Sequence, residues 1–258
     1  NLTNNGSIVI TDFELQFLNY IEDADSIVSI EDGTITSTNT TTLRTVNRVT
    51  FSNGSTAAIN GNTGGVTIAS PVYNGTGLIT TGTVSIPSGT IASLNVQSGT
   101  ASADALTVNS NVDIDAGGAL SLTGANTVTG NLTVTGSLTS TSGVLSLNAD
   151  LSLPVTAASF DANGGTIRFT GTGIQTVNPG LNGAAANAFN VIDIAKTGGS
   201  ITFITNPLTV TTLTQGSANA VGITFNQNLT VTDAVVFNTS GTVTLGDNAA
   251  DIFIFNDG

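Results

Sequence analysis

Asp113 and Asp115 are the residues whose type and spacing most suggest chemistry, because alternation within a strand would place both carboxylates on one outward face. Paired carboxylates serve polysaccharide-cleaving enzymes and bind Ca²⁺, but such sites also need a base or a neighbouring cation. The chain has only four cationic residues, scattered along its length: Arg44, Arg48, Arg168 and Lys196. We therefore interpret the two aspartates as part of a solvated strand face.

Residues 245–258, which contain Gly246 and Gly258 together with the three aspartates Asp247, Asp251 and Asp257, form a second candidate site. The run is similar to the Gly/Asp turns that bind Ca²⁺ in nonapeptide solenoids, but those solenoids repeat the motif in tandem. A single imperfect copy favours a plain turn into a last strand. Ca²⁺ binding stays open as the alternative, and we expect no other cofactor and no metal or catalytic residue.

The amino-acid composition excludes most enzyme chemistry. The chain contains no His, Cys, Met or Trp, which removes imidazole bases, thiol nucleophiles, disulfides and the usual transition-metal ligands. Seventeen acidic residues against four basic ones give a net charge of −13, which disfavours binding to nucleic acid or to anionic membranes. The longest apolar runs, such as residues 234–237, are far shorter than the roughly 18 residues that span a bilayer. We therefore expect a protein that is not an enzyme and does not insert into membranes.

Short apolar-polar-apolar triplets dominate the chain from about residue 51 onward and alternate with Gly, Asn and Ser turns. Alternation with a period of two, rich in Thr and β-branched residues, is typical of β-strands. The clearest triplets are residues 84–86, 94–96, 106–108, 112–114, 120–122, 132–134, 145–147 and 151–153. The pattern predicts an all-β protein built from many short strands.

Similar segments recur at a nearly fixed spacing in the C-terminal part. The segments that start at Ser200, Gly222 and Thr242 follow one another at nearly equal steps, and a further similar segment starts earlier, at Thr166. A repeat of about 20–22 residues is the size of one coil of a parallel β-helix, in which coils stack about 4.8 Å apart. We therefore predict a β-solenoid over residues 51–258 with coils of this length. Asn residues at its corners should form hydrogen-bonded ladders.

The first 50 residues differ from the rest because they hold seven of the seventeen acidic residues by residue 32. Thr11 to Glu14 matches a capping box, and Phe13, Phe17 and Ile21 have helical spacing, although residues 13–17 also alternate as a strand. We favour a short amphipathic helix here that covers the first coil, because a solenoid needs its open end covered. Residues 1–50 are thus predicted to be an acidic capping or assembly segment.

Residues 189–203, continuing into residues 207–210, resemble the degenerate β-strand repeats of very large bacterial secreted surface proteins. The nearest groups are filamentous-haemagglutinin-like adhesins and autotransporter passengers, and the likeness extends in style over residues 51–258. The resemblance implies a right-handed parallel β-helix that is exported to the cell surface and acts as a stalk, adhesin or fibre. It transfers no catalytic residue to this chain.

The resulting hypothesis is an extracellular structural protein that assembles with copies of itself from head to tail. The expected interface joins an apolar C-terminal strand to apolar residues near the N-terminus, because the C-terminal strand has none of the charges that usually protect a sheet edge. Its members are Ile252, Phe253, Ile254 and Phe255 on one side and Ile8, Ile10, Phe13 and Phe17 on the other. The alternative is a solenoid that binds or cleaves carbohydrate, and host or surface glycans are further candidate partners.

Overall fold

The computed structural model describes most of the chain from residue 78 onward. Side chains are described for residues 78–86, 88–153, 160–180, 188–216, 219–233 and 235–256. For residues 1–77 it describes only the backbone of residues 2–4, 7–17, 20–22, 27–37, 44–46, 49–51, 56–60, 66–68, 72–73 and 77. Every regular element among these residues is a β-strand. The described residues therefore contain no helix that could span a membrane.

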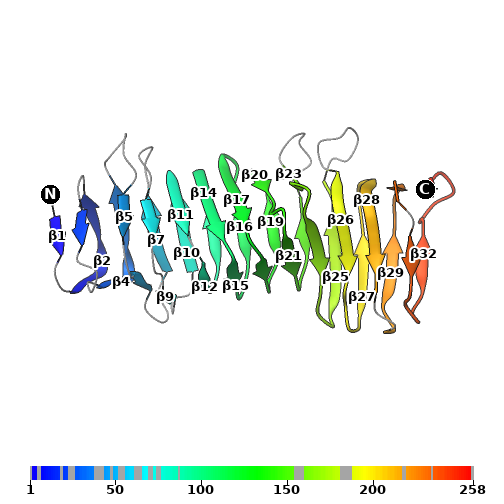
Figure 1. Ribbon diagram of the computed structural model, residues 1–258, viewed down its shortest axis with the longest axis horizontal. Helices are drawn as coiled ribbons and strands as arrows, with labels where there is room; N and C mark the ends of the chain where they lie inside the picture. Colours follow the sequence, from blue (N-terminus) through cyan, green and yellow to red (C-terminus); the bar gives the residue numbers. More distant parts are fainter. Residues whose placement is uncertain are drawn as a thin grey trace.

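The largest sheet, sheet 1, contains fourteen strands and runs along the length of the molecule (Figure 1). All of its strand pairs are parallel, and each pair joins one coil to the next. Its strands are β2 (Ser7–Phe17), β4 (Ile27–Ser37), β6 (Val49–Phe51), β7 (Thr56–Asn60), β9 (Val72–Tyr73), β10 (Gly77–Thr81), β13 (Leu94–Val96), β16 (Val112–Ile114), β19 (Leu132–Val134), β22 (Leu151–Ser152), β25 (Ile174–Asn178), β27 (Ser200–Phe203), β29 (Gly222–Phe225) and β32 (Val243–Leu245).

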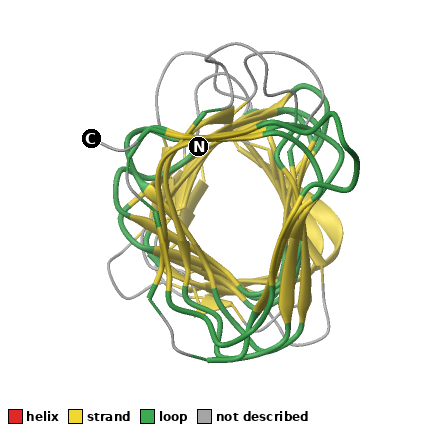
Figure 2. Ribbon diagram, turned by 90° about the vertical axis from the view of Figure 1, so that its right-hand side faces the viewer, coloured by secondary structure: helices red, strands yellow, loops and turns green. Residues whose placement is uncertain are grey.

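Two further parallel sheets complete the walls of the solenoid, and Figure 2 shows the strands surrounding the long axis. Sheet 2 contains β5 (Arg44–Val46), β8 (Val66–Ile68), β11 (Thr83–Ile86), β14 (Gly99–Asp104), β17 (Gly118–Thr123), β20 (Ser137–Thr139) and β23 (Phe160–Asp161). Sheet 3 contains β12 (Gly89–Ile91), β15 (Leu106–Val108), β18 (Asn126–Val128), β21 (Val144–Leu147), β24 (Thr166–Phe169), β26 (Phe189–Ile194), β28 (Leu208–Gln215), β30 (Leu229–Val231), β31 (Val236–Phe237) and β33 (Phe253–Phe255). A small separate sheet pairs β1 (Leu2–Asn4) with β3 (Tyr20–Glu22). The predicted parallel β-helix is therefore confirmed.

The predicted N-terminal helix is wrong, because β2 and β3 occupy its residues. The parallel pairing of β2 with β4 gives the backbone of residues 7–17 its hydrogen-bond partners in a neighbouring strand. The alternation of residues 13–17 was the correct signal, and the helical spacing of Phe13, Phe17 and Ile21 was coincidental. The division of the chain at residue 50 stays a prediction, and sheet 1 continues across it because β4 pairs with β7.

The triplets form strands because their outer two residues point into the solenoid. In β13, Leu94 and Val96 are buried while Asn95 between them is partly exposed. Equivalent inward residues lie in register from coil to coil, as Leu94 pairs with Val112 and Val112 with Leu132. Each fully buried aliphatic side chain contributes about 1.5–3 kcal/mol. The stacked columns are therefore the main source of stability.

Coil length varies more than the sequence spacing predicts, as the residue numbers of paired strands in sheet 1 show. Leu78 of β10 pairs with Leu94 of β13, so this coil is shorter than predicted. Leu151 of β22 pairs with Val177 of β25, and Val177 pairs with Phe203 of β27, so these two coils are longer than predicted. The pairing of β27 with β29 and of β29 with β32 agrees with the predicted length. The prediction therefore holds for the C-terminal coils, from which it was made.

The early copy of the repeat at Thr166 belongs to a different wall. Residues 166–169 form β24 of sheet 3, whereas residues 200–203 form β27 of sheet 1. The true partner of β27 in the preceding coil is β25, with Val177 opposite Phe203. Both walls need the same inward-outward alternation, so sequence similarity alone does not distinguish them.

Sheet 2 ends at β23, and longer strands of sheet 3 continue its column. Phe160 of β23 contacts Phe189 at the start of β26, with ring centroids 5.1 Å apart. Phe189 in turn pairs with Val210 of β28, and Val210 pairs with Val231 of β30. The inward column that starts in sheet 2 therefore continues in sheet 3. There the long strand β28 pairs with two shorter strands, β30 and β31.

Side chains and glycines at the corners fix the stacking of the coils. The backbone N–H of Asn131 donates to Asn111 Oδ1 at 3.0 Å, and the N–H of Asp150 donates to Asn131 Oδ1 at 3.2 Å. The N–H of Thr176 then donates to Asp150 Oδ1 at 2.7 Å, which confirms the expected corner ladder. At another corner, a Cβ on Gly136 would lie 2.1 Å from the backbone oxygen of Gly118, so only glycine fits there.

Candidate functional site

Asp113 and Asp115, the acidic pair singled out from the sequence, lie on and directly after β16. Asp113 lies on the outer face of sheet 1, where Asn95 and Thr133 are its neighbours in register. Asp115 follows β16 and is also partly exposed. The described residues contain no group of three or more acidic side chains that could hold a metal ion. The two aspartates therefore fit the interpretation of a solvated face.

The turn at residues 246–251 is held together by its own side chains. Asp251 Oδ2 accepts hydrogen bonds from the backbone N–H groups of Asp247 and Asn248, at 2.9 and 3.1 Å. Asn248 Nδ2 donates to Asp247 Oδ1 and to Asp251 Oδ1 at 2.9 and 3.2 Å. Three carboxylate oxygens of Asp247 and Asp251 thus accept hydrogen bonds from N–H groups within the turn, an arrangement that fits a plain turn.

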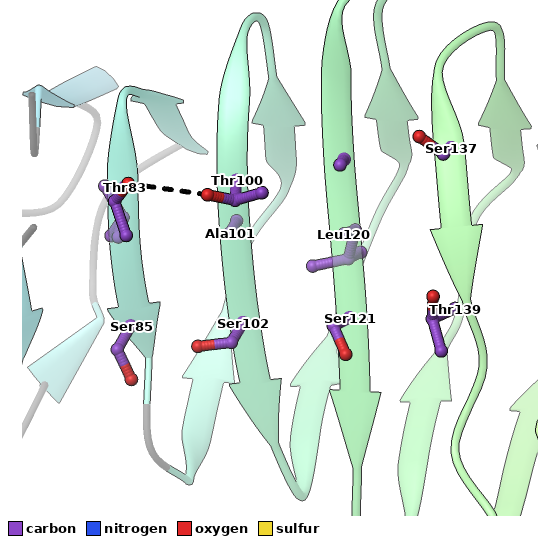
Figure 3. A pocket seen from close by; sticks show the side chains of 11 residues that line it. Thr83, Ser85, Thr100, Ala101, Ser102, Leu120, Ser121, Ser137 and Thr139 are labelled. Carbon is purple, nitrogen blue, oxygen red and sulfur yellow. Dashed lines mark hydrogen bonds between the residues drawn. The ribbon is translucent and has the colours of Figure 1, made fainter. Parts of the chain in front are cut away.

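A hollow of about 350 Å³ lies on the outer face of sheet 2. It spans β11, β14, β17 and β20, and Figure 3 shows its side chains arranged in two files across the strands. One file consists of Thr83, Thr100, Ala119 and Ser137, and the other of Ser85, Ser102, Ser121 and Thr139. Seven of these eight outward positions therefore carry a hydroxyl group.

The hollow contains no charged and no aromatic side chain. Thr83 Oγ1 and Thr100 Oγ1 lie 3.4 Å apart, within hydrogen-bond distance of each other (Figure 3). In the described part of the chain, the hydroxyls of Ser85, Ser102 and Ser121 make no hydrogen bond to the protein. A hydroxyl can both donate and accept, so this surface can offer both functions to a bound molecule.

Lys196 is fully buried between two coils and has neutral partners. Its Nζ donates to Gln175 Oε1 at 2.8 Å and lies 3.5 Å from the backbone oxygen of Thr170. Gln175 is also fully buried, and its Nε2 donates to the backbone oxygens of Leu147 and Ala149 at 3.1 and 2.8 Å. Desolvation by burial lowers the pKa of the Lys196 ammonium below its ordinary value of 10.5. This network belongs to the core and does not reach a surface site.

Arg168 and Asp193 form an ion pair on the outer face of sheet 3. Arg168 Nε lies 2.8 Å from Asp193 Oδ2, and the Arg168 side chain is 43% exposed. Thr214 Oγ1 donates to Asp193 Oδ1 at 3.2 Å. The three residues are neighbours in register on β24, β26 and β28, so the pair braces adjacent coils.

The C-terminal strand β33 is less protected than the strands inside the stack. Phe253 packs partly against the core above Leu229, and Phe255 lies above Val231 with 42% of its surface exposed. Ile252 and Ile254 are 57% and 42% exposed. Other large apolar side chains exposed in these last two coils are Val236 and Leu245. The predicted C-terminal half of the interface is therefore an apolar surface at the end of the described coils.

The predicted N-terminal half of the interface is described only as backbone. Ile8, Ile10, Phe13 and Phe17 all belong to β2, and their side chains lie outside the described residues. The two termini lie at opposite ends of the long molecule (Figure 1). This placement is what a head-to-tail contact between copies requires.

The hydroxyl-lined hollow is the feature that reasoning from the sequence missed. Each of its strands shows the ordinary alternation, with an outward Ser, Thr or Ala on either side of a buried residue such as Val84 or Leu120. What makes the hollow is the register that places four such strands side by side. A search for consecutive coils that have only Ser, Thr or Ala at both outward positions would have found it.

Comparison of the chain with protein-family models, curated proteins and solved structures gives no match.

Proposed function

We propose that this chain is a structural β-solenoid segment of an extracellular filament, fibre or adhesin stalk, and that it is not an enzyme. The observation that carries the proposal is the stack of coils joined by sheet 1, whose last described strands carry exposed apolar side chains such as Phe255. A stalk needs length and rigidity more than it needs a reactive cleft. A column of buried side chains with parallel strands perpendicular to the axis supplies both.

The joint between copies is proposed to lie at the two ends of the stack. The outer edges of β32 and β33 have no strand partner among the described residues, and each strand pairs only with the coil before it. An incoming coil would take up these backbone groups and cover Leu245, Ile252 and Phe255. Such a head-to-tail contact generates an open filament when it does not close into a ring.

The exported, surface-bound location is part of the same proposal and rests on the resemblance of residues 189–203 to secreted bacterial repeat proteins. The composition fits the structural part of the proposal, because only 8% of the chain is charged and the described outer walls are rich in Ser and Thr. Stacked identical charges would repel along a wall whose rows lie about 4.8 Å apart. The composition therefore suits a long solenoid.

The experiment replaces both Phe253 and Phe255 with Asp and measures assembly by sedimentation velocity over a range of protein concentrations. The unaltered chain should form larger species as its concentration rises, and the double variant should remain monomeric, because charge at the joint prevents an apolar contact. Salt should strengthen the joint by screening the acidic N-terminal segment.

Ile174→Asp is the matched control, because Ile174 is 79% exposed on a side wall and lies away from the end. This variant should assemble as the unaltered chain does. Equal assembly of the Phe253/Phe255 double variant and this control would contradict the proposed joint.

A further inference from the structure

We propose that the hollow on sheet 2 binds an uncharged, extended carbohydrate chain that runs along the solenoid axis. The proposal goes beyond the structural role and does not depend on assembly, because β11, β14, β17 and β20, which carry the hollow, lie away from the C-terminal end (Figure 1). Its volume of about 350 Å³ is within the range of small-molecule sites.

The lining selects the class of ligand. Anionic ligands such as phosphates, sulfates or uronates need cations, and the lining has none on a chain of net charge −13. Cationic ligands find no carboxylate there. Hydroxyl groups beside the methyl groups of Thr83, Thr100 and Ala119 instead match a neutral sugar, which also presents hydroxyls beside C–H surfaces.

The repetition of the lining selects a chain over a single sugar. Ser85, Ser102 and Ser121 are neighbours in register on successive coils, so their hydroxyls recur about every 4.8 Å along the axis. Among the residues whose side chains are described, these hydroxyls have no hydrogen-bond partner. A ligand that repeats its own hydroxyls at a similar interval can use several coils at once, which compensates for weak individual contacts.

Sheet 3 provides a natural comparison within the same molecule. Thr90, Thr107 and Thr127 form a similar file of outward hydroxyls in register on β12, β15 and β18. None of the three lines the hollow on sheet 2. Substitutions on sheet 3 therefore remove hydroxyls without touching the proposed site.

The test measures binding of xylohexaose, an uncharged linear hexasaccharide, to the full chain by calorimetry and by NMR shift changes. We expect a dissociation constant of about 1 mM or tighter and shift changes confined to β11, β14, β17 and β20. Ser102→Ala combined with Ser121→Ala should weaken binding about tenfold, because two hydrogen bonds are lost. Thr107→Val combined with Thr127→Val is the control and should bind as the unaltered chain does.

Three outcomes would overturn the proposal. The first is no binding of xylohexaose at millimolar concentration, and the second is equal loss in the sheet 2 and sheet 3 variants. The third is equal or tighter binding of the charged hexagalacturonate, since a lining without cations should reject it. The proposed function is unaffected by any of them, because filament growth is measured without carbohydrate.

Discussion

The coils before residue 153 and the coils after residue 160 fill the same solenoid with different side chains. In the described part of the first region, residues 78–153, the core is aliphatic, and no coil is as long as the two that follow it. In the second region, the coils lengthen and then shorten again toward the C-terminus, and the core gains Phe169, Phe203 and Phe225. The core therefore gains aromatic side chains along the axis, whereas the additional length of the two longest coils includes residues 154–159 and 181–187, which lie outside the described residues.

The phenylalanines of the second region form a continuous column. The rings of Phe169 and Phe203 meet edge to face at 6.0 Å, and those of Phe203 and Phe225 stack at 4.8 Å. The same region buries Lys196 and Gln175, which fill space with polar groups that satisfy each other. The core of the second region thus depends on a few large residues, whereas the core of the first region depends on many smaller aliphatic side chains.

The largest expected effect is at the centre of this column. Phe203→Ala should lower the free energy of unfolding by about 3–5 kcal/mol, because it removes a buried ring that has aromatic partners on both sides. Leu145 is a fully buried residue of the first region, and Leu145→Ala should lower the free energy of unfolding by less, about 2–3 kcal/mol. Urea denaturation measures both variants, and a larger cost at Leu145 would refute the proposed dependence on large residues.

Lys196, which is buried in the second region, should make the stability of the fold depend on pH. Because burial lowers its pKa, the fold favours the neutral amine, and charging the amine destabilises the fold. The free energy of unfolding should therefore increase as pH rises from the lowered pKa toward 10.5, the ordinary value reached in the unfolded chain. Lys196→Met removes this titration.

The measurement compares the unfolding free energies of the unaltered chain and of Lys196→Met at several pH values. The difference should shift in favour of the unaltered chain on the alkaline side. Arg168→Met is the control, because it removes a partly exposed cation of a surface ion pair instead of a buried one. A pH-independent difference for Lys196→Met would show that its burial does not disfavour the charged form.

A smaller effect on stability is expected from the corner ladder of the first region, which includes Asn111 and Asn131. Asn131→Ala removes the acceptor for the N–H of Asp150, and the loss should cost about 1 kcal/mol. Asn109→Ala is the matched control, because Asn109 is exposed and its side chain makes no hydrogen bond in the described structure. Thermal denaturation of the two variants should separate them, and equal melting temperatures would mean that the ladder does not stabilise the fold.

The smallest effect on stability is expected from the surface ion pair of the second region, Arg168 with Asp193. Arg168→Gln should change the free energy of unfolding by no more than about 1 kcal/mol, because a partly exposed pair is screened by water and salt. Repeating the measurement in high salt should shrink the difference further. A larger loss that persists in high salt would place the pair among the main supports of these coils.

The sequence alone predicted the solenoid because its triplets report directly which residues point inward. Leu94 and Val96 around Asn95 illustrate this, since the alternation of a strand is visible without any knowledge of its neighbours. The exposed apolar character of the C-terminal strand was also predictable, because residues 252–255 contain only Ile and Phe and lack protecting charges.

The features that the sequence did not predict depend on contacts between coils. Residues 166–169 resemble residues 200–203 because all walls share one pattern, and only strand pairing separates β24 from β27. The helix predicted near Phe13 failed because local spacing competes with pairing to β4. The burial of Lys196 and the hollow beside Ser102 arise where neighbouring coils meet, and a single coil carries no signal for either.

Small-angle X-ray scattering over a concentration series tests the central claim, a rigid solenoid that grows from end to end, most directly. At low concentration the profile should be that of a rod with a constant cross-section. As concentration rises, the rod should lengthen while the radius of its cross-section stays the same, because copies stack along the axis. A compact, sphere-like profile would contradict the solenoid, and a cross-section that thickens with concentration would contradict growth from end to end.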